Sequence, residues 1–261
     1  MPSRLIEETT RWELLVDPGG RPGAENMAID AGLLARADRT GSAFLRLYRF
    51  QPPCLSLGRN EPAAARYDRA AIARRGLDVV RRPTGGRAVW HEHEVTYAMA
   101  APIATFGGLR GAYHAIHARL AAALHTLGVA ATLAPDRLTA RPPDRRGSCF
   151  AAPVGGEVLV GGRKLVGSAQ VCEGRAFLQH GSILLAGSQE VVRLVSREPG
   201  AGSRETTLAA ALGRPVSFDE VADAVIEAFG DVGAQHAAPR PSDGPTVRPS
   251  VFQDPAWTWR R

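Results

Sequence analysis

A cysteine and a lysine in neighbouring segments are the residues of this sequence best suited to covalent chemistry. Cys149 follows a Pro/Arg-rich stretch and precedes apolar residues, which is typical of a loop-to-strand junction where reactive groups are often found. A thiol attacks as its thiolate, and a nearby ammonium such as that of Lys164 favours the thiolate. The pair therefore suits nucleophilic acyl transfer, although a structural cysteine is the alternative interpretation.

Lys164 is also unusual because the remaining cations are all arginine. Lys and Arg together number 32, and Lys164 is the single lysine among them. A site that retains lysine in such a sequence can require a compact ammonium rather than a planar guanidinium. Chance survival of one lysine is the alternative, and composition alone leaves both open.

The other two cysteines have weaker claims to a role in the reaction. Cys54 stands in an apolar stretch and is expected to fill the core, whereas Cys172 is expected near the tip of a hairpin. An odd number of widely spaced cysteines does not make a disulfide framework. A reducing, cytoplasmic location is therefore expected.

A glycine pair flanked by arginines is a second candidate site. Gly85 and Gly86 follow the predicted strand at 77–81, and paired glycines let the backbone approach a ligand closely. Arginines can hold a carboxylate or a phosphate through two parallel hydrogen bonds. The sequence favours a ligand-binding loop here over a simple hairpin turn with solvated arginines; its polar members are Arg81, Arg82, Arg87 and His91.

Histidines recur at spacings that can bind zinc, but no complete ligand set accompanies them. His91 and His93 share a face of an extended segment, and His114, His117 and His125 share a face of a helix. No cysteine or carboxylate completes a recognisable zinc motif, so no metal site is expected.

Bulk properties limit the class of protein. The net charge of +6 and the isoelectric point of about 9.9 suit either nucleic acid or acidic protein partners. Zinc-finger spacing and RNA-binding aromatic motifs are missing, so nucleic-acid binding is not expected. No apolar run approaches the ~18 residues needed to span a membrane, and residues 1–12 have no signal-peptide core, so neither a membrane segment nor secretion is expected.

Runs of strands followed by runs of helices predict an α+β fold. We expect strands at 13–16, 44–48, 54–57, 77–81, 95–100, 129–133, 157–160, 164–171 and 176–185, the last three as a meander. Helices are expected from residue 24 and at 68–75, 109–127, 189–195, 207–212 and 217–229, with loops at 17–20 and 135–147. Residues 1–235 are predicted to form one catalytic domain, and residues 236–261 a Pro-rich linker and C-terminal tail.

Three segments in order resemble the biotin/lipoate protein ligase superfamily, over about residues 12–230. Residues 79–91, followed by Glu94-Val95-Thr96-Tyr97, are similar to its lipoyl-pocket loop. Residues 162–170 resemble its lysine strand, and residues 178–183 resemble the strand that follows. Within the superfamily the resemblance is closest to LipM-type octanoyl-[acyl carrier protein]:protein N-octanoyltransferases. ATP-using lipoate ligases usually have glycine where this chain has Arg87, and usually lack a cysteine corresponding to Cys149.

The resemblance implies a mixed β-sheet flanked by helices, of the biotin/lipoate protein ligase catalytic-domain type. It implies that Cys149 accepts the acyl group and that Lys164 favours its thiolate. The residues implied to shape the substrate pocket are Arg81, Arg82, Gly85, Gly86, Arg87, His91, Gly167, Ser168, Ala169 and His180. Glu92 stands where the family pattern has aspartate and is left unassigned.

The same resemblance implies transfer of an octanoyl group in lipoate biosynthesis, without ATP or another cofactor. The implied donor is octanoyl-acyl carrier protein. The implied acceptor is a lysine of a lipoyl-domain protein, such as glycine-cleavage H protein or a dehydrogenase E2 subunit. An ATP-dependent lipoate-protein ligase is the alternative enzyme, and a non-catalytic binding protein that keeps the pocket is the third hypothesis.

Overall fold

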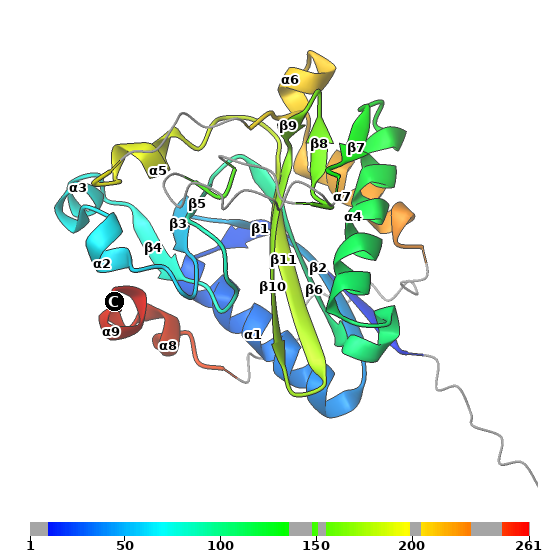
Figure 1. Ribbon diagram of the computed structural model, residues 1–261, viewed down its shortest axis with the longest axis horizontal. Coiled ribbons are helices and arrows are strands. Elements are labelled where there is room, and N and C mark those ends of the chain that lie inside the picture. Colours follow the sequence, from blue (N-terminus) through cyan, green and yellow to red (C-terminus); the bar gives the residue numbers. More distant parts are fainter. Residues whose placement is uncertain (1–9, 136–147, 151–154, 199–204, 231–246, 261) are drawn as a thin grey trace, which may run out of the picture.

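A five-stranded mixed sheet runs through the centre of the molecule, in the order β1-β2-β6-β11-β10 (Figure 1). The structure is a computed structural model that describes residues 10–135, 148–150, 155–198, 205–230 and 247–260. β1 pairs in parallel with β2, and the remaining neighbours pair antiparallel. The strands are β1 (Trp12–Arg21), β2 (Ala43–Phe50), β6 (Glu94–Pro102), β10 (Val166–Glu173) and β11 (Ala176–Leu184).

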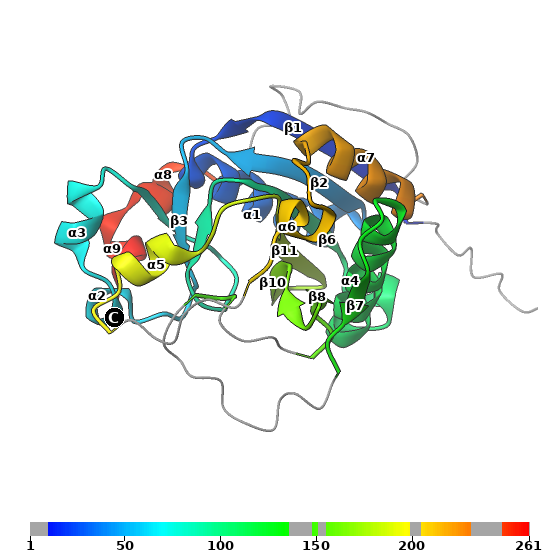
Figure 2. The same cartoon turned by 90° about the horizontal axis from the view of Figure 1, so that it is seen from above.

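Helices cover both faces of this sheet, which confirms the predicted α+β fold with a mixed sheet flanked by helices (Figure 2). Helix α1 (Gly23–Thr40) packs on one face, and helices α4 (Leu109–Thr126) and α7 (Phe218–Ala228) pack on the other. Residues 44–48 alternate apolar residues with Arg46, a pattern that predicts a half-buried strand, but that prediction is wrong because both faces of β2 are covered. Arg46 is tolerated inside because its guanidinium donates to the Asp30 carboxylate at 2.9 Å and to the Asn26 side chain at 2.7 Å.

Two small sheets complete the frame around the candidate site. One has the order β4-β3-β5, formed by β3 (Cys54–Leu57), β4 (Asp78–Arg81) and β5 (Val89–His91). The other has the order β7-β8-β9, formed by β7 (Ala131–Leu133), β8 (Val158–Val160) and β9 (Arg163–Lys164). The predicted strand at 164–171 is thus divided, so that Lys164 lies in a small sheet and Ser168 in the central one.

The shorter elements show further differences from the sequence predictions. Residues 17–20, expected as a loop, belong to β1 at a point where its register shifts. The remaining helices are α2 (Ala63–Arg66), α3 (Arg69–Arg74), η1 (Ile103–Phe106), α5 (Glu190–Leu194), α6 (Leu208–Leu212), α8 (Ser250–Gln253) and α9 (Pro255–Thr258). Within the expected tail, α8 packs on α1 and α9 packs on β4. The predicted loop at 135–147 lies almost wholly outside the described residues.

Within the described ranges, no helix is both long and apolar enough to cross a membrane.

Candidate active site

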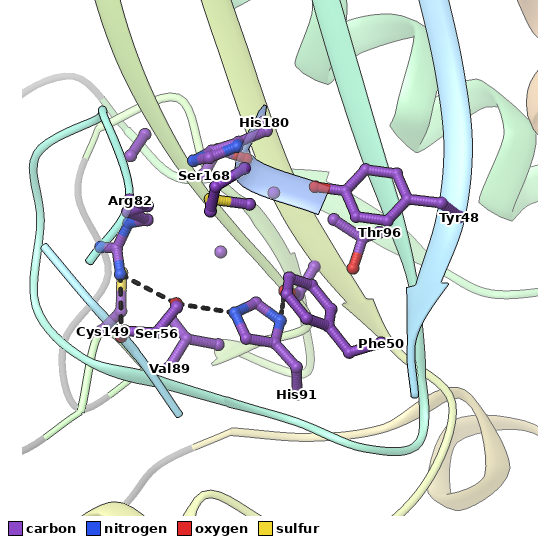
Figure 3. A pocket seen from close by; sticks show the side chains of 15 residues that line it. Tyr48, Phe50, Ser56, Arg82, Val89, His91, Thr96, Cys149, Ser168 and His180 are labelled. Carbon is purple, nitrogen blue, oxygen red and sulfur yellow. Dashed lines mark hydrogen bonds between the residues drawn. The ribbon is translucent and has the colours of Figure 1, made fainter. Parts of the chain in front are cut away.

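A cavity lies between the central sheet and the β4-β3-β5 sheet (Figure 3). Seven of the strands and helices described above contribute to its wall, so the site depends on the packing of both sheets. The lining residues that Figure 3 labels are Tyr48, Phe50, Ser56, Arg82, Val89, His91, Thr96, Cys149, Ser168 and His180. Apolar walls with a few polar groups are typical of pockets for small organic groups.

Cys149 reaches this cavity and contacts Lys164. The Lys164 Nζ lies 3.8 Å from the Cys149 Sγ and donates to the Cys149 carbonyl oxygen at 2.9 Å. The cysteine is held by its own backbone, because its N–H donates to the Ala88 carbonyl at 2.9 Å. Of the other thiols, Cys54 is fully buried on β3 and Cys172 is exposed on β10. The structure therefore places the predicted pair of Cys149 and Lys164 together at the cavity.

Glu157 is a charged residue of this site to which the sequence analysis assigned no role. Its carboxylate accepts from the Lys164 Nζ at 2.6 Å, and both side chains are at most 2% exposed. Tyr113 of α4 faces the same carboxylate, and its hydroxyl pKa is raised by burial and by the negative charge of Glu157. A lone buried lysine requires a buried anion, and this requirement was the available signal for Glu157.

Gly86 of the glycine pair lies against the thiol, and Arg82 holds this loop through hydrogen bonds to its backbone. A Cβ added at Gly86 would lie 3.9 Å from the Cys149 Sγ and 2.8 Å from the Arg82 Nη2. The Arg82 guanidinium donates to the carbonyls of Gly85 and Arg87 at 2.7 Å each and to Ser56 at 3.1 Å. Arg82 therefore shapes the loop from inside.

Arg81 lies away from the cavity and holds two distant parts of the chain together. Its guanidinium donates to five backbone carbonyls, those of Gly58, Arg59, Glu61, Thr258 and Arg260. These contacts join β4 to α9 and the segment that follows it. The position of Arg81 thus supports a structural role, and its side chain is not among those that line the cavity.

A hydrogen-bonded chain around His91 forms one side of the cavity (Figure 3). The His91 Nε2 lies 2.7 Å from the Ser56 Oγ, and its Nδ1 lies 2.5 Å from the Glu94 carboxylate. Phe50 stacks on the imidazole with ring centroids 4.1 Å apart. These contacts fix the imidazole plane, so this wall is rigid.

His180 is fixed in the same way on the opposite wall. Its Nδ1 lies 2.9 Å from the Asp30 carboxylate, and its Nε2 lies 2.6 Å from the Thr84 hydroxyl. Burial lowers the His180 pKa more than the contacts with Asp30 raise it. Burial alone would raise the Asp30 pKa, but the contacts with His180 and Arg46 lower it. The arrangement is therefore a neutral imidazole that donates to an ionised carboxylate.

Ser168 links the cavity to a buried polar chain under α4. Its Oγ lies 2.7 Å from the Tyr97 hydroxyl and 2.8 Å from the His117 Nε2. Burial, and then the charge of Lys164, lowers the His117 pKa to about 3. His117 is therefore neutral, and its Nε2 shares a hydrogen bond with the Ser168 hydroxyl. In the described part of the chain, no three His, Cys, Asp or Glu side chains gather as metal ligands.

The predicted site residues divide into two groups. Seven of them line the cavity, namely Arg82, His91, Cys149, Gly167, Ser168, Ala169 and His180. The other five are not among the lining residues. Lys164 lies behind Cys149, and the remaining four are Arg81, Gly85, Gly86 and Arg87. Among lining residues that the sequence analysis did not assign, Met27 comes from a helix and Ser56 from a strand distant in the sequence.

Comparison with families and curated sequences gives a consistent result. A family model described as "Lipoyl protein ligase A/B catalytic domain" matches residues 22–230. The octanoyltransferase LipM of Moorella thermoacetica is 39% identical over 222 residues, which cover 83% of this chain and 81% of that protein. The octanoyltransferase LipM of Symbiobacterium thermophilum is 39% identical over 236 residues, which cover 84% of this chain and 85% of that protein.

Solved structures show the same fold at lower sequence identity. A putative lipoate protein ligase from T. acidophilum, Ta0514 with bound lipoic acid, superposes with a TM-score of 0.77 at 18% identity, covering 96% of this chain and 100% of that one. Lipoate-protein ligase A bound with ATP superposes with a TM-score of 0.72 at 20% identity, covering 90% of this chain and 91% of that one. At these identities the likeness concerns the fold alone.

Proposed function

The chain belongs to the lipoyl protein ligase A/B catalytic domain family as an octanoyltransferase of lipoate biosynthesis, and we propose that it carries the octanoyl group as a thioester on Cys149. The observation that carries this proposal is the contact of Cys149 with Lys164 at the wall of the cavity. A thiol beside a buried ammonium is suited to attack on a thioester carbonyl.

In the first half-reaction the donor is octanoyl-acyl carrier protein. The Cys149 Sγ forms a bond to the octanoyl carbonyl carbon, and the bond from that carbon to the carrier's sulfur breaks. The thiol proton leaves Cys149 and the carrier's thiolate takes up a proton, so charge and atoms balance. The Lys164 ammonium stabilises both the attacking thiolate and the oxyanion that develops on the carbonyl.

In the second half-reaction the acceptor is a lipoyl-domain protein, such as glycine-cleavage H protein or a dehydrogenase E2 subunit. Its neutral lysine amine forms a bond to the acyl carbon, and the carbon–Sγ bond breaks. One amine proton returns to the Cys149 thiolate, which restores the resting enzyme and leaves a stable amide. The donor is already an activated thioester, so the proposed reaction requires no ATP, and a cytoplasmic setting suits both partners.

Intact-protein mass spectrometry after mixing with octanoyl-acyl carrier protein tests this proposal. We expect one octanoyl adduct on the wild type and none on Cys149→Ala. Cys54→Ala and Cys172→Ala serve as matched controls and should keep the adduct, because those thiols lie away from the cavity lining. An adduct on Cys149→Ala, or acceptor modification that needs ATP and free octanoate, would refute the covalent route.

A further inference from the structure

The Lys164 ammonium is shared between Cys149 and a carboxylate that the proposed reaction does not use. An ammonium has three N–H donors. One is directed to the Glu157 carboxylate at 2.6 Å and one to the Cys149 carbonyl oxygen at 2.9 Å, with the Cys149 Sγ at 3.8 Å. Two short contacts therefore fix the direction in which the third donor meets the sulfur.

We propose that Glu157 is a positioning residue for acyl transfer, which anchors the Lys164 ammonium and competes with the Cys149 thiolate for it. This inference rests on the proposed function of Cys149. Glu157 acts through Lys164 and does not contact the reacting atoms. Its effect is to limit the thiolate fraction of the resting enzyme while holding the ammonium in place.

Counting charges gives the sign of the effect. With Cys149 as a thiol, the buried group of Glu157, Lys164 and Cys149 carries no net charge. Ionisation of the thiol leaves a net negative charge in a site where the Glu157 and Lys164 side chains are at most 2% exposed, which is costly. With glutamine at position 157, the ammonium and the thiolate would instead form a neutral pair. The negative charge of Glu157 therefore opposes ionisation of the Cys149 thiol.

The other polar groups around the site do not change this sign. From α4, Tyr113 faces Glu157, His114 lies against Gly156, and His117 is kept neutral. Those from other elements are Tyr97 on β6, Glu205 bridged to the Lys164 backbone, and Arg82 beneath Gly86. All are common to the wild type and the Glu157 variants, so they cancel in the comparison between them.

Alkylation of Cys149 by iodoacetamide across pH, followed by peptide mass spectrometry, tests the inference without any acyl donor. Glu157→Gln keeps an oxygen that can accept from Lys164 and removes only the charge. We expect its alkylation midpoint to move to lower pH and its alkylation near pH 7 to be several-fold faster. Exposed Cys172 in the same sample is the internal reference for reagent activity.

Matched variants separate this role from general stabilisation. Glu13→Gln on β1 removes the same charge from an ion pair with Arg36 of α1 and should leave the midpoint unchanged. Glu157→Asp keeps the charge and should show no downward shift, although transfer should slow about tenfold because the anchor is shorter. In a Lys164→Met background, the buried Glu157 side chain has no cation partner and is expected to take up a proton. Adding Glu157→Gln should then have little further effect, as expected for two residues that act through one contact.

An unchanged or higher midpoint in Glu157→Gln would overturn the inference. If Glu157→Gln does not fold, the Lys164→Met/Glu157→Gln double variant is compared with Lys164→Met instead. The double variant has no buried charge at either position. A difference in alkylation midpoint between these two proteins would overturn the inference. Because no donor is present, these results are independent of whether Cys149 becomes acylated. Failure of the proposed function would appear only in the adduct experiment.

Discussion

Lys164 is the residue whose chemical type is hardest to exchange in this site. Its side chain is 1% exposed and has a carboxylate, a carbonyl and a thiol around one nitrogen. A guanidinium is planar and wider, and its charge is spread over three nitrogens. It cannot meet three acceptors arranged around one point, even though arginine keeps the positive charge.

We therefore predict that Lys164→Arg lowers the rate of octanoyl transfer by about a hundredfold or more, since a displacement of about 1 Å can cost that much. Lys164→Ala should move the pH midpoint of Cys149 alkylation upward, because the cation is lost. Transfer rates measured beside thermal unfolding and alkylation curves check both statements. Transfer by Lys164→Arg near the wild-type rate would show that charge alone is needed.

At the scale of elements, the glycine loop is held by a close approach of two backbone segments. A Cβ at Gly58, just after β3, would lie 1.8 Å from the Gly86 carbonyl oxygen. The same segments are joined by the Arg59 N–H, which donates to the Thr84 carbonyl at 2.8 Å. The loop over Cys149 therefore depends on a residue outside the cavity.

Gly58→Ala is expected to displace this loop, to destabilise the fold by about 1–3 kcal/mol and to slow acylation of Cys149. Thermal unfolding and intact-mass time courses measure the two effects. Gly85→Ala is the matched control for stability, because a Cβ there meets nothing within 4 Å. Equal melting temperatures for the two variants would contradict the proposed close packing.

Elements with a strong local pattern were predictable from the sequence, whereas long-range partners were not. The helix at 109–127 follows apolar spacing, and the helix after Ser217 follows its N-cap, whose Oγ accepts from the Glu220 N–H at 3.1 Å. The strand at 89–91 was missed because it is three residues long inside a glycine-rich segment. Strand 164–171 was predicted whole because no local signal marks the point at which Leu165 crosses between sheets.

The candidate site shows the same division between local and long-range information. Cys149, Lys164 and the segment 167–169 were found because their motifs are local. The arginines were expected to shape the substrate pocket; Arg82 does line the cavity, and both Arg81 and Arg82 donate to backbone carbonyls of segments distant in the sequence. Which acceptor a buried arginine finds depends on tertiary packing, and a single sequence carries no local signal for it.

At the scale of the whole molecule, burial of neutral histidine makes the stability depend on pH. The His117 pKa falls from 6.5 to about 3 on folding. Below pH 6.5 the unfolded chain binds a proton that the folded protein does not, so stability decreases as pH falls from 6.5 towards 3. The expected slope from this group is about 1.4 kcal/mol per pH unit.

His117→Gln removes the titrating group while keeping an amide that can hydrogen-bond with Ser168. Between pH 6.5 and pH 5, the wild type should lose about 1.6 kcal/mol more unfolding free energy than this variant. Urea unfolding at the two pH values measures the difference. His180, whose pKa is also lowered, is present in both proteins and cancels. Parallel pH dependences would show that His117 does not stay neutral in the fold.

The composition of the chain has a consequence for how this enzyme behaves as a reagent. A catalyst that acylates ε-amino groups carries one such group itself, and that group is buried in an ion pair. Chain termini aside, the protein offers no accessible amine as a competing acceptor, so self-modification through an amide cannot consume the donor. Amide-linked octanoyl-lysine in a reaction mixture can therefore be attributed to the acceptor protein without a background correction. For the same reason, amine-reactive dyes would label the partner proteins selectively.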